Sequence, residues 1–258
     1  MIRNLFIIAG AAMVLCLACL GGAAALGGRA LADNDWTWVI TDDGNGDDDF
    51  HMERGDAGPD ITRTLAWHGD RKLTIETSAD VTYVQGPEAK VVVTGPKSAV
   101  ERVRLVNGVL SLEDSDRTER GYLSIGPNGI RVWSDTERLK ITVTAPSVDT
   151  IRVDGSSDVT VEGYDRPSFE LYLDGSGDVK ATGKTGKLTL RINGSGDADL
   201  DGLEVSDATI EVAGSGDTSV GPTGAATVEI SGSGDVDLTR KPRSLERNIS
   251  GSGEVSGG

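Results

Sequence analysis

The chain has 258 residues, with 35 Gly, 4 Trp, 4 Tyr, 3 Phe and only two Cys. So few aromatic residues argue against a bulky globular core. The formal net charge is −16, from 41 acidic and 25 basic residues. This balance disfavours a nucleic-acid or anionic-membrane partner, because binding to either requires a cationic face.

The first 32 residues have the features of a secretory signal peptide. Arg3 opens a short basic segment, an apolar run follows from Leu5 to Leu26, and Ala30-Leu31-Ala32 forms a small-x-small cleavage pattern. An uncleaved N-terminal anchor is the alternative, because the run is just long enough to cross a hydrocarbon core of ~30 Å. Both cysteines, Cys16 and Cys19, lie in this segment. We therefore expect export to the cell envelope, and a mature chain without disulfides, thiolate metal sites or a membrane span.

Residues 33–60 are expected to form an acidic, disordered linker. The run TDDGNGDDDF, residues 41–50, combines charge and Gly with little apolar surface to bury. A calcium loop of the EF-hand type does not fit this run. Counted from Asp43, Asp48 stands where Gly is required, and Arg54 stands where the last Glu ligand is required.

Six tetrads in the second half of the chain share a Gly-Ser-x-acid pattern. Their leading glycines are 20, 19, 20, 18 and 19 residues apart. A fixed period near 20 with one turn per period predicts a solenoid, in which each coil buries its apolar side against its neighbours. We expect these six glycines to be structural turn residues: Gly155, Gly175, Gly194, Gly214, Gly232 and Gly251.

The residues beside each tetrad predict β-strands. Ile151 and Val153 precede the first tetrad, Val159 and Val161 follow it, and polar residues alternate with them, as in the later repeats. Equivalent strands of successive coils would stack in parallel, and parallel crossovers are almost always right-handed. The predicted fold is therefore all-β, a right-handed parallel β-helix or β-solenoid over residues 61–258, with regular coils over 151–258.

Residues 61–150 are expected to form irregular first coils of the same solenoid. Leu73 and Ile75 precede Thr77-Ser78-Ala79-Asp80, and Val81 and Tyr83 follow, which matches the later coils except at the first Gly. Three further segments with strand patterns are Val91–Val93, Leu110–Leu112 and Ile141–Val143, and the polar run 113–121 suggests a loop insertion. A separate small β domain in this region is the alternative.

The outermost repeat departs from the pattern. Arg247 stands in a column that is otherwise Ile, Leu or Val, and Arg240, Lys241, Pro242 and Arg243 precede it. Charge and proline at an open sheet edge oppose the addition of another strand. We therefore interpret this repeat as a terminal cap.

The fourth residue of each tetrad would form a ladder of acids along the solenoid, ~4.8 Å apart: Asp158, Asp178, Asp197, Asp217, Asp235 and Glu254. A cation site is one hypothesis, because Ca²⁺ prefers carboxylate, hydroxyl and carbonyl oxygens. The favoured hypothesis is structural, because an Asp side chain can accept the unpaired backbone N–H groups of a turn. We accordingly expect no metal or cofactor.

No catalytic site is predicted. The histidines, His51 and His68, both lie outside the repeats, so the repeats cannot build a Ser-His-Asp, Cys-His or two-His metal site. A catalytic carboxylate pair needs two different environments, whereas identical coils supply one. The aromatic residues are expected to be packing residues rather than ligand platforms: Trp36, Trp38, Trp67, Trp133, Tyr164, Phe169 and Tyr172.

The segments ITVTAPSVDTIRVDGSSDVTVEG (Ile141–Gly163) and LTIETSADVTYVQG (Leu73–Gly86), together with the Gly-Ser-Gly-Asp tetrads, resemble the head GIN domain family. The resemblance covers about residues 65–258. It implies an exported, non-enzymatic β-helix with a role in cell adhesion and no catalytic residues. The competing hypothesis is a periplasmic envelope protein that binds a polysaccharide or a partner protein. Both a protein and a glycan remain open as the ligand.

Overall fold

The computed structural model describes residues 36–42, 50–55, 58–68, 71–113, 121–126 and 129–257. These residues fall into two compact units, which divide the chain at positions 57/58, 117/118 and 134/135. The predicted signal peptide, residues 1–32, lies outside the described residues. Within the described ranges, no helix has both the length and the hydropathy needed to cross a bilayer.

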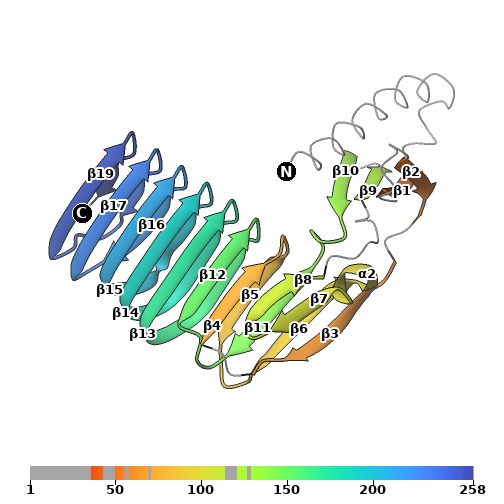
Figure 1. Cartoon of the computed structure of the whole chain (residues 1–258), viewed down its shortest axis with the longest axis horizontal. Coiled ribbons are helices and arrows are strands. Elements are labelled where there is room, and N and C mark those ends of the chain that lie inside the picture. The colour runs from red at the N-terminus through yellow and green to blue at the C-terminus, as the bar shows by residue number, and fades with distance from the viewer. Residues whose placement is uncertain are drawn as a thin grey trace. The chain divides into compact units, whose positions relative to one another are not determined.

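The smaller unit contains a four-stranded antiparallel sheet in the order β10-β9-β1-β2 (Figure 1). Its strands are β1 (Trp36–Asp42), β2 (Phe50–Arg54), β9 (Gly121–Gly126) and β10 (Gly129–Ser134). Ile40, Tyr122 and Leu123 are buried, and the ring of Tyr122 stacks on that of Trp133 with centroids 5.7 Å apart.

This sheet corrects two expectations. Residues 33–60 are not a linker throughout, because the aromatic and β-branched residues of WTWVIT, residues 36–41, form a strand. The acidic run at residues 43–49 lies outside the described residues. Residues 61–150 are not one series of coils, because β9 and β10 pair with β1 rather than with the solenoid.

The larger unit is a β-solenoid of stacked coils with a period of about 20 residues, as predicted (Figure 1). Its regular part comprises β12 (Thr150–Gly155), β13 (Val159–Gly175), β14 (Val179–Gly194), β15 (Ala198–Gly214), β16 (Thr218–Pro222), β17 (Ala225–Gly232), β18 (Val236–Leu238), β19 (Ser244–Gly251) and β20 (Val255–Gly257). Neighbouring coils pair in parallel at equivalent positions, as in Ile151↔Leu171, Leu171↔Leu190 and Leu190↔Ile210.

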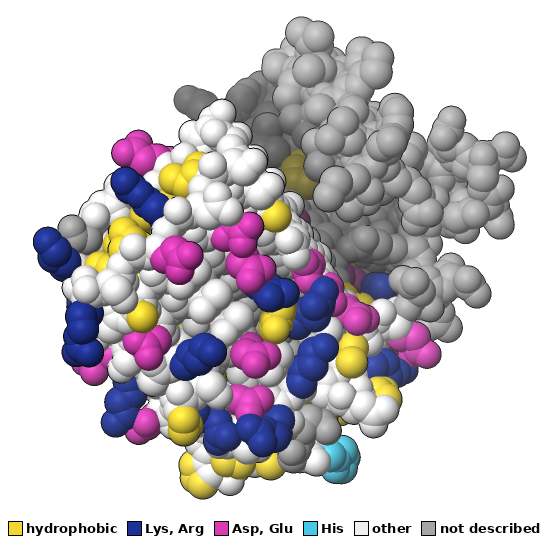
Figure 2. Space-filling model, turned by 60° about the vertical axis from the view of Figure 1, so that its left-hand side comes forward, with side chains coloured by type: hydrophobic (Ala, Val, Ile, Leu, Met, Phe, Trp, Pro, Cys, Tyr) yellow, Lys and Arg dark blue, Asp and Glu magenta, His cyan; other side chains and the backbone are white. Residues whose placement is uncertain are grey.

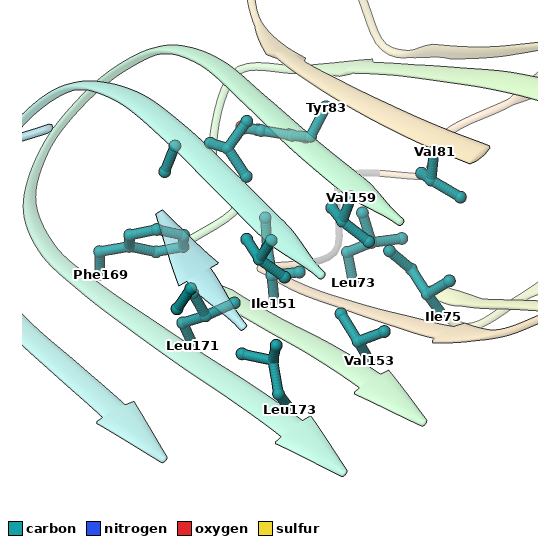
Figure 3. Close-up of a cluster of buried hydrophobic side chains, with 14 of the residues drawn as sticks. Leu73, Ile75, Val81, Tyr83, Ile151, Val153, Val159, Phe169, Leu171 and Leu173 are labelled. Carbon is teal, nitrogen blue, oxygen red and sulfur yellow. The ribbon is translucent and has the colours of Figure 1, made fainter. Parts of the chain in front are cut away.

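The core fills the inside of the coils with columns of aliphatic side chains. Leu73, Ile151, Leu171 and Leu190 form one such column, and each is fully buried. Figure 3 shows part of this core, where Val81 and Val159 on one side of the coil face Leu73 and Ile151 on the other. Burying one such side chain stabilises the fold by roughly 1.5–3 kcal/mol, so the repeated columns hold the stack together.

The first coils contain β3 (Asp60–Ala66), β4 (Lys72–Glu76), β5 (Asp80–Gln85), β6 (Lys90–Pro96), α2 (Lys97–Val100), β7 (Val103–Val106), β8 (Val109–Leu112) and β11 (Lys140–Ala145). The strands β4 and β5 stack on β12 and β13 in the predicted register, with Leu73↔Ile151 and Val81↔Val159, although residues 86–149 separate them in sequence. Beyond this coil, the β3–β6, β6–β11 and β7–β8 pairs are antiparallel. Even so, β8 and β11 stack in parallel on β4 and β5, as expected for a further coil, with Leu110 beside Ile75 and Ile141 beside Val81. The first coils are therefore irregular because antiparallel strands are added to parallel ones.

Candidate functional site

The tetrads form one corner of the solenoid, between the strand that enters each coil and the strand that follows. From the second tetrad onward, the N–H of each Ser donates to the carbonyl oxygen of the leading Gly in the preceding coil, at 2.8–2.9 Å. Ser176 donates to Gly155 in this way, and Ser195 donates to Gly175. The corner is therefore a continuous backbone ladder.

Both glycines of the tetrad are required by this close stacking. The leading Gly has a φ between +131° and +157°, which side chains rarely adopt. A Cβ added at Gly194 would also lie 2.0 Å from the carbonyl oxygen of Gly175, and one at Gly196 would lie 2.1 Å from that of Gly177. Such separations are essentially never seen for real Cβ atoms, so each corner from the second tetrad onward excludes side chains at these positions.

The first tetrad shows what happens where a corner stacks on a different sequence. A Cβ at Gly155 would be 3.4 Å from the carbonyl oxygen of Thr77, which is an ordinary contact. Ser157 replaces the second glycine here; it is fully buried, and its hydroxyl donates to the Thr77 carbonyl oxygen at 2.5 Å. The corner at Thr77–Asp80 thus accommodates side chains that the later corners exclude.

The side-chain carboxylates of the tetrads accept hydrogen bonds from the backbone, and each donor is the N–H of the tetrad acid in the next coil. The Oδ1 of Asp158 accepts from the N–H of Asp178 at 3.1 Å, and the Oδ1 of Asp178 accepts from the N–H of Asp197 at 2.9 Å. The ladder continues at 2.7–2.8 Å through Asp217, Asp235 and Glu254. All these acids are exposed, so water screens their mutual repulsion. The carboxylates thus accept backbone N–H groups, as in the structural hypothesis, but the donors belong to the next coil rather than to the same turn.

The hypothesis that the acid ladder binds a cation stays a prediction. Each Asp from Asp158 to Asp235 already uses one carboxylate oxygen as an acceptor for backbone N–H. Among the residues that the structure describes, no group of three or more His, Cys, Asp or Glu is arranged to hold a metal ion.

The ionisable groups with shifted pKa values do not assemble a catalytic pair. Burial raises the pKa of Tyr83 to about 12 and also raises that of Tyr164, and both rings lie in the core. The Lys180 ammonium lowers the pKa of the Asp199 carboxyl through their exposed ion pair. Of the histidines, His51 lies in β2 and His68 is an exposed residue after β3.

The aromatic residues of the solenoid serve mainly as core. Trp67, Tyr164 and Phe169 are buried, and the last two rings lie 4.3 Å apart. Tyr172 is half-buried on the outer surface, with the guanidinium carbon of Arg152 5.7 Å from its ring centroid. Tyr164 and Phe169 are therefore not available as stacking surfaces for sugars.

A groove along the opposite corner of the coils was not anticipated from the sequence. It has a volume of about 520 Å³ and is lined by Asp165–Pro167, Lys184–Gly186, Glu204–Ser206, Thr223 and Arg240. An ion pair joins Lys184 to Asp165 at 3.1 Å, and Arg166 donates to the Pro146 carbonyl oxygen. A second set of periodic glycines marks this corner in the sequence: Gly163, Gly183, Gly202 and Gly221.

Comparison with known proteins identifies the family. Residues 71–242 match the family model described as "Putative auto-transporter adhesin, head GIN domain". The chain belongs to the head GIN domain family. Because the match begins at β4 and extends through the regular coils, it covers the residues that form the acid ladder up to Asp235. A search of curated proteins gave no match.

One of the solved structures similar to this chain shares its fold. A putative adhesin from Bacteroides fragilis NCTC 9343 is 19% identical, with a TM-score of 0.58 over 76% of this chain and 96% of that chain. A putative adhesin from Parabacteroides merdae ATCC 43184 is 14% identical, with a TM-score of 0.46 over 78% and 97% of the two chains. The first comparison supports the solenoid fold of this chain.

Proposed function

We propose that this protein is an exported, non-enzymatic adhesion and interaction module of the cell envelope. The observation that carries the proposal is the family match over residues 71–242, because the family and the Bacteroides fragilis structure are both named as putative adhesins. The signal-peptide pattern of residues 1–32 supports export.

The structure of the repeats supports a role that does not involve catalysis. In these similar corners, the tetrad carboxylates accept hydrogen bonds from backbone N–H groups. The corner acids therefore lack the two contrasting environments that a catalytic pair of carboxylates needs. A rigid solenoid of this kind instead displays a long, regular surface, and such surfaces suit the binding of extended partners.

Protease treatment of intact cells that produce a tagged chain would test the proposal. We expect the solenoid to be digested before the outer barrier is permeabilised, and a strain without the protein to adhere less to surfaces or cells. Digestion only after permeabilisation, with unchanged adherence, would contradict the adhesin proposal.

Binding of a polysaccharide or protein within the envelope is the second candidate function. The groove beside Lys184 and Glu204 favours it, because charged and hydroxyl side chains from successive coils line one continuous hollow. Under this candidate, the protein is protected in intact cells and retains envelope polysaccharide on a column. Replacing Lys184 and Arg240 with Ala would abolish that retention without unfolding the protein.

A further inference from the structure

The outer edge of β19 is unlike the edge of any coil inside the stack. Strand β19 pairs with β17 along one side, and no described strand pairs with its other side. The backbone N–H and C=O groups along such an edge form a template for another strand, and the charge and proline of this repeat, interpreted above as a cap, restrict which strands can add.

Three side chains of β19 continue the inward columns of the solenoid. The register places Leu245 beside Ala226, Arg247 beside Val228 and Ile249 beside Ile230. The β17 residues are at most 2% exposed, whereas Leu245 and Ile249 are each 40% exposed. The exposed end of the core therefore carries an aliphatic side chain on either side of a cationic one, in the order Leu245, Arg247, Ile249.

Four exposed cations lie in or just before β19 in the sequence, and Arg247 is the one within the strand: Arg240, Lys241, Arg243 and Arg247. None of them has a carboxylate within ion-pair distance among the residues that the structure describes, although the chain carries a net charge of −16. Figure 2 shows this end turned toward the viewer, where Lys and Arg side chains lie next to exposed hydrophobic ones. The edge thus combines unpaired positive charge with exposed apolar surface.

We propose that the outer edge of β19 binds an extended segment of a partner protein by strand addition, and that this segment carries Asp or Glu between two aliphatic residues. The acid would lie opposite Arg247, and the aliphatic residues would cover Leu245 and Ile249. Because the pattern aliphatic-x-acid-x-aliphatic is symmetric, it fits β19 in either strand direction. This inference rests on the proposed function as an interaction module and names its surface and partner chemistry.

The same edge disfavours a second copy of the chain. Antiparallel pairing of two β19 strands with Leu245 opposite Ile249 would place the two Arg247 side chains opposite each other, and like charges there are destabilising. Arg247 therefore opposes self-pairing and purely aliphatic strands while favouring an acidic one. Specific interfaces often use one residue both to repel wrong partners and to attract the right one.

Peptides copied from the neighbouring coil, residues 225–238, provide the test. One peptide carries Val228→Glu and the other Val228→Lys, and each is titrated into the purified full chain by fluorescence anisotropy. We expect the Glu peptide to bind at least about tenfold more tightly than the Lys peptide, with the difference reduced at high salt. The variant Arg247→Glu should reverse this preference, and Arg247→Lys should keep it.

Arg191→Glu is the matched control, because Arg191 is paired with Glu211 on the outer face of the coils. It should leave the preference for the Glu peptide unchanged. Equal binding of the two peptides, no binding of either, or concentration-dependent dimers of the full chain in sedimentation would overturn the inference. Those results would leave cell-surface exposure and adherence untouched, so they are distinguishable from failure of the proposed function.

Discussion

The regular coils and the first coils of the solenoid bury the same kind of aliphatic column, but their corners are built differently. From Gly175 onward, each corner stacks on a corner of like sequence, and backbone atoms approach so closely that no Cβ fits. At the boundary between the two regions, Thr77, Ala79 and Ser157 place side chains where the later tetrads have glycine. The second glycine is therefore required by the contact between two like corners, whereas the leading glycine is also required by its positive φ, which Gly155 keeps at the boundary.

Substituting Gly196 should produce the largest effect on this contact. Its φ lies outside the strained region, so Gly196→Ala tests only the clash with the Gly177 carbonyl oxygen, 2.1 Å from the added Cβ. We expect a loss of at least about 3 kcal/mol in the free energy of unfolding by urea, because the backbone on both sides cannot move away freely.

Ser157→Gly is the matched change at the boundary. It removes the hydrogen bond to Thr77 and should cost only about 1–2 kcal/mol. A Gly196→Ala variant as stable as the natural chain would show that the corners can separate, and would contradict the stacking explanation.

Removing a carboxylate from the acid ladder should have the next largest effect. Asp197→Ala leaves the N–H of Asp217 without its acceptor and should cost about 1–2 kcal/mol, whereas Asp197→Asn keeps an oxygen there and should cost less. Glu254→Ala is the control, because no described backbone N–H donates to that side chain. Equal losses in urea unfolding for Asp197→Ala and Glu254→Ala would argue against a structural ladder.

Tyr83 gives the first coils a dependence on alkaline pH. Burial raises its pKa to about 12 from 10.0, so between these values the unfolded chain releases this proton and the folded chain keeps it. Stability is therefore full below pH 10 and declines as the pH rises toward 12, by up to about 1.4 kcal/mol per pH unit for one proton.

The variant Tyr83→Phe should show a shallower decline over that range. It also loses the bond from the Tyr83 hydroxyl to the Ala145 carbonyl oxygen, which should cost about 1 kcal/mol at pH 7. Denaturant unfolding of both proteins from pH 8 to 12 measures the two effects. An unchanged pH slope would mean that Tyr83 ionises in the folded protein as it does in water.

Substitutions on the outer face of the coils should have the smallest effect on the free energy of unfolding. Arg191 and Glu211 form an exposed ion pair at 3.1 Å, with side chains 47% and 39% exposed. We expect Arg191→Ala to lower the free energy of unfolding by less than about 0.5 kcal/mol, because water and salt screen such pairs. A loss above 1 kcal/mol that disappears in 1 M salt would show that charge on this face also stabilises the stack.

Periodicity made most of the solenoid predictable from the sequence. The spacing of the tetrads and the alternation around Ile151 and Val159 predicted the coils, and the Thr77–Asp80 variant located the coil that stacks beneath them. The Asp column predicted an acid ladder, and the structural hypothesis anticipated bonding to backbone N–H.

The rest of the fold could not be predicted from the sequence, because it depends on pairing between strands that are far apart in the chain. Strand β1 lies in a segment dominated by acid and Gly, and its partner β9 comes 80 residues later, which no local pattern reveals. The strands of the antiparallel β3–β6 and β7–β8 pairs alternate apolar and polar residues just as parallel strands do, so alternation alone could not distinguish them. The groove at Lys184 is lined by residues from five successive coils, although the periodic glycines at 163, 183, 202 and 221, which precede it in the first four of these coils, could have indicated a second corner.

The most direct test of the central claim, that the tetrad acids serve the backbone rather than a metal, is urea unfolding of the natural chain and Asp197→Asn with calcium or with a chelator. We predict the same unfolding midpoint for the natural chain in both conditions, and a small loss for the variant that calcium does not change. A calcium-dependent stabilisation of several kcal/mol in the natural chain, abolished by Asp197→Asn, would contradict the account and make the corner a cation site.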